Sequence, residues 1–159
     1  MVSTGDEAPD FTAPVATGDI ETFTLSEVVS AEAPVVLAFF PGAFTRVCSH
    51  EMSTFEERLK SLTESGGVLY GVSIDTPFAL DEFRNELGLS FGLISDSNRD
   101  IVHEYGVAMD FEGIGVENLA KRAVFVIDQS GEITYAWVSD DPGREPEYEE
   151  VEAAVREAA

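Results

Sequence analysis

Cysteine and histidine are nearly absent from this sequence of 159 residues, which contains one cysteine, Cys48, and two histidines. One cysteine cannot form a disulfide within the chain, so any cysteine chemistry must involve a second molecule. One cysteine and two histidines are also too few for the cysteine-rich and histidine-rich patterns that bind zinc. We therefore expect no metal site and no other cofactor.

Long apolar segments are also missing. The longest apolar run covers residues 35–40, whereas a membrane-spanning helix needs about 20 apolar residues. Residues 1–14 contain neither the basic segment nor the apolar segment of a secretion signal. These absences predict a cytoplasmic protein that does not enter membranes.

Basic residues are few: nine of them stand against 31 acidic residues, which gives a formal net charge of -22 at pH 7. Such a chain repels nucleic acid and anionic membranes, so both are excluded as partners. The carboxylates are distributed along the whole chain rather than held in one tail, which favours the solvated acidic surface of a halophilic protein. An ordinary acidic protein of a mesophile is the alternative.

The chain does contain enough apolar sequence for one domain, because 44% of its residues are apolar and eleven are phenylalanine. We assign residues 1–159 to a single domain. Apolar runs typical of buried strands alternate with apolar stripes at helical spacing, which predicts an α/β fold with a mixed sheet flanked by helices. The predicted strands are residues 35–40, 68–74, 92–95, 123–128 and 132–138, after an N-terminal hairpin at residues 10–24. The predicted helices are residues 26–31, 48–64, 77–87, 98–105 and 148–158, and residues 106–119 are predicted to form a loop.

Cys48 lies at the start of one predicted helix, soon after the apolar strand. Apolar side chains recur along this helix at steps of four and three residues, at Cys48, Met52, Phe55, Leu59 and Leu62. Active sites of open α/β sheets lie at the carboxyl ends of strands, which is the predicted position of this segment. Free backbone N–H groups and the helix dipole stabilise a thiolate in the first turn of a helix. Thr45, three residues earlier, is the predicted N-cap.

Pro41, Thr45 and Cys48 reproduce a Pro-x-x-x-Thr-x-x-Cys motif, and here the sequence resembles the peroxiredoxin family. Residues 121–128 resemble that family's later strand, which carries an arginine, and residues 5–11 resemble its N-terminal segment. The three places occur in the family's order and span nearly the whole chain. The resemblance implies a thioredoxin-like fold, with the N-terminal hairpin as an extension, and a thiol-dependent peroxidase that reduces hydrogen peroxide and organic hydroperoxides.

The resemblance also implies a role for each of five residues. Cys48 is the thiolate that attacks the peroxide and becomes a sulfenic acid. Thr45 binds the peroxide through its hydroxyl group, and Arg122 stabilises the thiolate and the transition state. Pro41 walls the pocket against water. Glu51, one helical turn after Cys48, orients Arg122.

Ser53 departs from one pattern within the family. It stands five residues after Cys48, where a subgroup of the bacterioferritin-comigratory type carries a second, resolving cysteine, and the chain has no other cysteine. The sequence is therefore similar to one-Cys peroxiredoxins, including relatives of alkyl hydroperoxide reductase. The sulfenic acid must then be reduced by an external thiol, by a thioredoxin-like partner or through a mixed disulfide between subunits. The resemblance further implies a homodimer.

Other interpretations stand beside these. Cys48 alone could be an unreactive core residue, Thr45 a simple helix cap and Arg122 a surface salt-bridge partner. The alternative function is a peroxide-sensing redox switch or a partner-binding protein, in which oxidation of Cys48 changes assembly without repeated turnover. His50 points away from Cys48 on the predicted helix and is expected in solvent.

Overall fold

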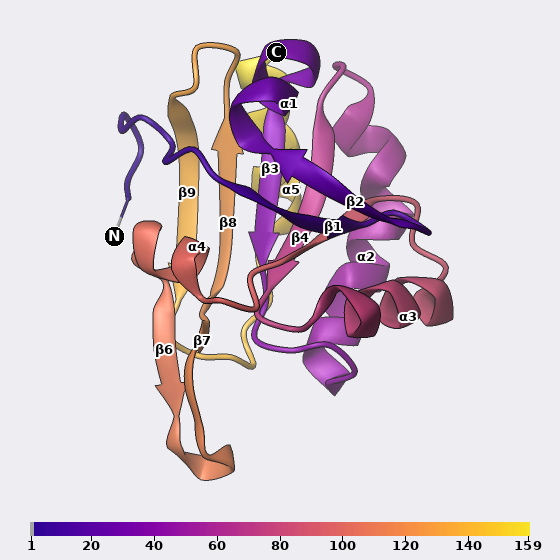
Figure 1. Cartoon of the computed structure of the whole chain (residues 1–159). Coiled ribbons are helices and arrows are strands. Elements are labelled where there is room, and N and C mark those ends of the chain that lie inside the picture. The colour runs from indigo at the N-terminus through magenta and orange to yellow at the C-terminus, as the bar shows by residue number, and fades with distance from the viewer. Residues whose placement is uncertain (1) are drawn as a thin grey trace.

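Seven strands form one continuous mixed sheet in the computed structural model, which describes residues 2–159 (Figure 1). In spatial order the strands are β2 (Ile20–Thr24), β1 (Thr12–Ala16), β5 (Gly92–Ser95), β4 (Val68–Ser73), β3 (Val35–Phe39), β8 (Arg122–Ile127) and β9 (Ile133–Ser139). Strands β3, β4 and β5 are parallel neighbours, whereas β8 runs antiparallel to β3, and β1 runs antiparallel to β5. The predicted N-terminal hairpin is thus confirmed, and it joins the sheet at one edge.

Helices cover both faces of this sheet, as predicted (Figure 1). One face packs against α1 (Leu25–Glu32) and α4 (Asp100–Glu104), and the other against α2 (Arg46–Thr63), α3 (Pro77–Leu87) and α5 (Tyr148–Ala158). The position of β3 between two cores explains why its sequence is apolar throughout. Leu37 and Phe39 pack into the core on the α1 and α4 face, whereas Val36 and Ala38 pack into the core on the opposite face. A strand with a core on each side has no solvent face, so both of its alternating sets are apolar.

Helix boundaries follow the local sequence signals closely. The side chain of Thr76 accepts a hydrogen bond from the N–H of Ala79, Pro77 is the first residue of α3, and Gly88 ends the helix with a left-handed backbone (φ 67°). Helix α2 begins at Arg46, two residues before the predicted start. None of the helices described within residues 2–159 is long and apolar enough to cross a membrane.

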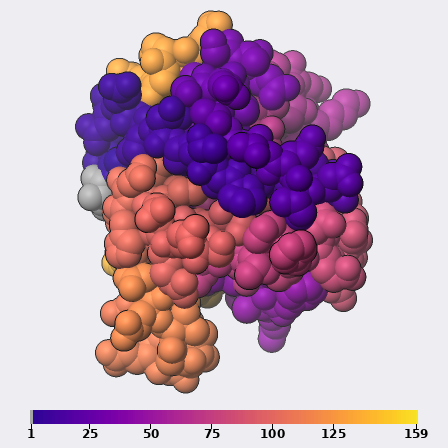
Figure 2. Space-filling model, viewed as in Figure 1, coloured from indigo at the N-terminus to yellow at the C-terminus, as the bar shows by residue number. Residues whose placement is uncertain are grey.

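The prediction of a loop at residues 106–119 is wrong. This segment contains β6 (Ala108–Phe111), a 3₁₀ turn (Glu112–Ile114) and β7 (Val116–Ala120), and the two strands form a separate antiparallel hairpin. The hairpin projects from the body of the molecule (Figures 1 and 2). No residue of β6 is fully buried and the pairing register shifts after Met109, so the alternation that identifies a strand is missing.

Candidate active site

The segment between β3 and α2 carries Cys48 to the carboxyl edge of the sheet. Thr45 is the N-cap by position and Cys48 is the third residue of α2, so its backbone N–H precedes the first helical hydrogen bond, from Ser49 N–H to the Thr45 carbonyl. A free N–H group and the positive end of an 18-residue helix therefore lie beside the sulfur. The Cys48 side chain itself is fully buried.

Arg122 reaches the same place through the pairing of β8 with β3. The register sets Ala123 opposite Phe39, so Arg122, at the start of β8, lies at the edge where β3 ends. Its Nη2 donates a hydrogen bond to Cys48 Sγ at 3.3 Å, and only 1% of the residue is exposed. The alternative interpretation of Arg122 as a surface salt-bridge partner is wrong.

Two further groups fix the Arg122 guanidinium. Its Nη1 donates to Glu51 Oε1 at 2.7 Å, as the resemblance implied, while Nε and Nη2 donate to the Pro142 carbonyl at 3.1 and 2.6 Å. The guanidinium is therefore held from α2 on one side and from the loop after β9 on the other. The Pro142 contact has no signature in the sequence, because any residue type can supply a backbone carbonyl.

Burial sets the charge on Glu51. Desolvation raises the pKa of this carboxyl to about 8, although Arg122 opposes the shift. Among the described residues, Glu51 Oε2 has no hydrogen-bond partner. Burial disfavours the charge on Arg122, but Glu51 and Cys48 outweigh it and raise the pKa of the guanidinium. Near neutral pH, Arg122 is thus a cation beside a neutral carboxylic acid, and its charge is available to a Cys48 thiolate.

Thr45 does not cap the helix with its side chain, so that part of the prediction is wrong. Its hydroxyl instead donates to the Gly42 carbonyl at 2.8 Å. A hydroxyl has one O–H, and with that donor engaged its oxygen remains free to accept a hydrogen bond from a bound molecule. Thr45 is exposed and lines the pocket above Cys48.

A pocket of about 290 Å³ leads to the buried sulfur. It brings together four of the five predicted site residues, Pro41, Thr45, Cys48 and Arg122, and the fifth, Glu51, lies directly behind Arg122. The remaining lining residues are Gly42, Arg46, Val47, Phe111, Ile114, Leu119, Pro142 and Gly143. The sequence analysis does not identify the three that come from the β6–β7 hairpin, because it predicts a loop at residues 106–119.

Asp75 supports the loop that precedes Cys48. Its Oδ2 accepts hydrogen bonds from the Ala43 N–H at 2.8 Å and from the Ser73 hydroxyl at 2.7 Å. The carboxylate thereby ties the β3–α2 segment to the end of β4. Its position directly after a buried parallel strand was the sequence signal that could have identified it.

Two residues near the site take no part in the contacts of Cys48. The side chain of His50 is 69% exposed and pairs with Glu145 at 2.6 Å, which confirms its expected place in solvent. Phe44 is 53% exposed and packs edge-on against Phe83 rather than lining the pocket. Within residues 2–159, no three His, Cys, Asp or Glu side chains are grouped to hold a metal ion.

The chain is similar to known proteins along most of its length. The sequence profile described as the AhpC/TSA family matches residues 4–136. The chain is 33% identical over 147 residues to the chloroplastic 2-cysteine peroxiredoxin of Chattonella marina var. antiqua, a match that covers 87% of this chain and 72% of that protein. It is 34% identical over 145 residues to alkyl hydroperoxide reductase C of Helicobacter pylori strain J99, covering 85% and 70% of the two proteins.

A solved structure extends the similarity to the fold. The crystal structure of peroxidoxin BcpB from Mycobacterium tuberculosis matches with a TM-score of 0.85 and 27% sequence identity, covering 100% of this chain and 99% of that one. The match over the whole chain confirms the predicted thioredoxin-like fold.

Proposed function

The chain belongs to the AhpC/TSA family, and from this membership and the geometry around Cys48 we propose that it is a thiol-dependent peroxidase. Its substrates are hydrogen peroxide and organic hydroperoxides. The observation that carries the proposal is the 3.3 Å contact between Arg122 Nη2 and Cys48 Sγ at the base of a pocket open to solvent. A buried cation beside the only cysteine favours its thiolate and has no comparable use in an unreactive core.

The reaction begins with attack of the Cys48 thiolate on one peroxide oxygen. The S–O bond forms as the O–O bond breaks, and the other oxygen leaves as alkoxide or hydroxide and takes a proton to become an alcohol or water. Cys48 is oxidised by two electrons to the sulfenic acid, and the peroxide is reduced by the same two electrons. Because negative charge moves onto the oxygens in the transition state, fixed donors placed there accelerate the step.

The neighbouring residues position the peroxide for this attack. Arg122 provides the fixed cationic donor and Thr45 an oxygen that accepts the peroxide O–H. The free N–H of Cys48 is a further donor, and Pro41 closes one wall of the pocket against water. Glu51 and the Pro142 carbonyl act through Arg122, because their hydrogen bonds hold its guanidinium beside the sulfur.

Reduction of the sulfenic acid needs a second molecule, since the chain has one cysteine. An external thiol attacks the Cys48 sulfur, water leaves, and a mixed disulfide forms. A second thiol then releases Cys48 as a thiol and carries away the disulfide. A small thiol or a thioredoxin-like protein fits this role.

The test is peroxide consumption with excess thiol, in the wild type and in Cys48→Ser. We expect many equivalents of peroxide per chain for the wild type and no turnover for the variant, because serine does not form the nucleophile. Mass spectrometry after one equivalent of peroxide should find one added oxygen on Cys48. Consumption of a single equivalent and no more would instead support the redox-switch alternative, and turnover by Cys48→Ser would refute the mechanism.

We further propose that residues 1–159 act as one domain, in the cytoplasm, as a homodimer adapted to high salt. Reducing thiols in the cytoplasm would regenerate Cys48.

The dimer proposal rests on Phe44 and Phe78, whose side chains are 53% and 78% exposed. They follow the carboxyl ends of β3 and β4 and offer apolar surface at one edge of the sheet. Sedimentation velocity tests the dimer: a monomer at micromolar concentration in both low and molar salt would contradict it.

A further inference from the structure

The β6–β7 hairpin forms one wall of the pocket above Cys48. Phe111, Ile114 and Leu119 from this hairpin all line the pocket, and all three are apolar. Figure 2 shows the hairpin projecting beside the segment at the start of α2, with a notch between them. The base of the hairpin reaches the core through Ala120, whereas Phe111, Ile114 and Leu119 line the pocket.

The pocket is much larger than hydrogen peroxide requires. A water molecule occupies about 30 Å³ in the liquid, and hydrogen peroxide has two oxygens where water has one, whereas the pocket measures about 290 Å³. The groups that serve the peroxide oxygens, Thr45 and Arg122, occupy one part of the lining. Hydrogen peroxide has no apolar group that could pack against the apolar side chains of the hairpin.

Ile114 is the most informative residue of this wall. It is 64% exposed, although it lines the same pocket as Leu119, which is 3% exposed. A large aliphatic side chain held in solvent at the mouth of a pocket gains favourable contacts when an apolar group covers it. The pocket runs from this side chain to Cys48, so an occupant can touch both.

Resting on the proposed function, we propose that Phe111 and Ile114 determine specificity by binding the alkyl or aryl group of an organic hydroperoxide. The peroxide end lies at Cys48, between Thr45 and Arg122, and the hydrocarbon lies against the hairpin. The bonds made and broken are those of the peroxidase reaction above, with an alcohol as the product.

The experiment compares the second-order rate constants for oxidation of Cys48 by cumene hydroperoxide and by hydrogen peroxide, using rapid quench and mass spectrometry. In Ile114→Ser and Phe111→Ser, the ratio of the cumene to the hydrogen peroxide constant should fall by about tenfold. Ile114→Leu should restore the ratio, because it restores an aliphatic surface. The matched control is Ile20→Ser, an isoleucine that is 43% exposed on β2 and should leave the ratio unchanged.

An unchanged ratio in both hairpin variants, or an equal loss with both peroxides, would overturn the assignment. Such a result would leave the proposed function intact, since the wild type would still reduce peroxide. If wild-type Cys48 reacts with neither peroxide, the proposed function itself fails. Circular dichroism of the variants separates either outcome from loss of folding.

Discussion

Arg122 is the residue through which the site is organised. Its guanidinium contacts the sulfur of Cys48, the carboxyl of Glu51 and the carbonyl of Pro142, which come from two helical positions and a distant loop. The guanidinium has five donors in a fixed planar arrangement that reaches all three partners, whereas the ammonium of a lysine is a compact charge on a flexible stem and has no such fixed geometry. The site therefore depends on the geometry of one side chain as much as on its charge.

Glu51 gives this arrangement a pH dependence. In the folded chain burial raises its pKa to about 8, whereas the ordinary value is 4.5. Between pH 4.5 and about pH 8, Glu51 is protonated in the folded state and ionised in the unfolded state. The stabilisation that comes from this proton is therefore complete below the unfolded-state pKa and is lost as pH rises through the folded-state pKa. Glu51→Gln removes this titration. We expect the free energy of unfolding to fall less in the variant than in the wild type between about pH 5 and about pH 8.

Urea unfolding followed by circular dichroism at the two pH values measures the effect. The matched control is Glu64→Gln at the end of α2, an exposed residue whose substitution should leave the wild-type pH dependence in place. A pH dependence identical in Glu51→Gln and the wild type would show that Glu51 is ionised throughout the range.

At the scale of elements, the site is assembled where the ends of β3, β4 and β8 meet. Asp75 joins two of these ends, because its carboxylate binds both the Ala43 N–H and the Ser73 hydroxyl. Removing it leaves two polar groups without their partner and frees the segment that carries Thr45 and Cys48.

We expect Asp75→Ala to slow oxidation of Cys48 by about tenfold and to lower the free energy of unfolding by about 1–3 kcal/mol. Asp75→Asn keeps one acceptor oxygen and should recover part of the rate. Single-turnover oxidation by hydrogen peroxide and urea unfolding measure the two effects. Asp81→Ala is the control, since Asp81 accepts a comparable backbone hydrogen bond, from Gly18, away from the pocket. A rate equal to that of the wild type in Asp75→Ala would show that the loop needs no such anchor.

The elements differ in how far the sequence predicts them. Strand β3 and helix α2 have continuous or periodic apolar patterns because tertiary packing buries them, and such patterns are visible in one sequence. The β6–β7 hairpin projects from the body and buries little, so nothing in its pattern separates it from a loop. Because the hairpin is not predicted, the pocket residues that it carries are not identified from the sequence.

The same contrast applies to the candidate site. Pro41, Thr45, Cys48, Glu51 and Arg122 were chosen through the motif and the resemblance, and the structure brings them together. Thr45 is the N-cap by position, as predicted, but its hydroxyl accepts no hydrogen bond from the helix and donates one to the Gly42 carbonyl. Pro142 acts through its backbone, which carries no signature in a sequence.

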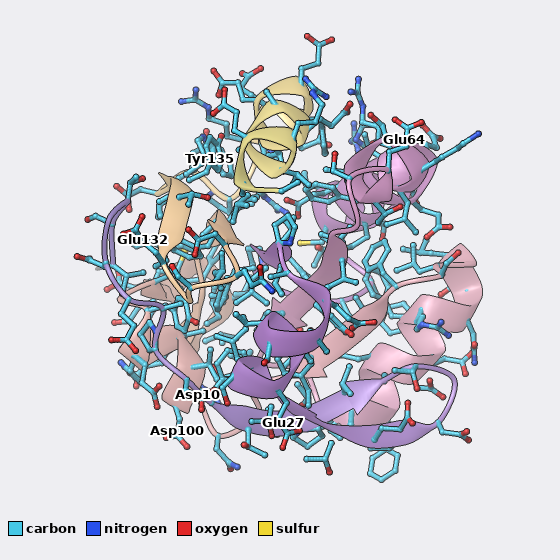
Figure 3. All side chains as sticks on the ribbon, turned by 90° about the horizontal axis from the view of Figure 1, so that it is seen from above. Asp10, Glu27, Glu64, Asp100, Glu132 and Tyr135 are labelled. Carbon is cyan, nitrogen blue, oxygen red and sulfur yellow. The ribbon has the colours of Figure 1, made fainter. Side chains whose placement is uncertain are left out.

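The whole molecule is dominated by its negative charge. The formal net charge is -22 at pH 7, and carboxylates such as Asp10, Glu27, Glu64, Asp100 and Glu132 are distributed around the molecule (Figure 3). Among the described residues, only three contacts join a lysine or arginine to an acidic side chain, and one of them is the buried Arg122–Glu51 contact, so few of the 31 acidic residues have a cationic partner. Their mutual repulsion opposes the compact state, and added salt weakens it.

This repulsion predicts a protein that is more stable in concentrated salt. For a chain of this size each 1 kcal/mol of stability corresponds to about 2–4 °C in the melting temperature, so a gain of a few kcal/mol between low and molar potassium chloride should raise it by roughly 10 °C. Melting followed by circular dichroism at pH 7 measures the change. The internal control is the same comparison near the isoelectric point of about 4.1, where the net charge is lost and the salt effect should shrink. A melting temperature independent of salt at pH 7 would contradict adaptation to high salt, because the acidic surface would then impose no repulsion for the ions to relieve.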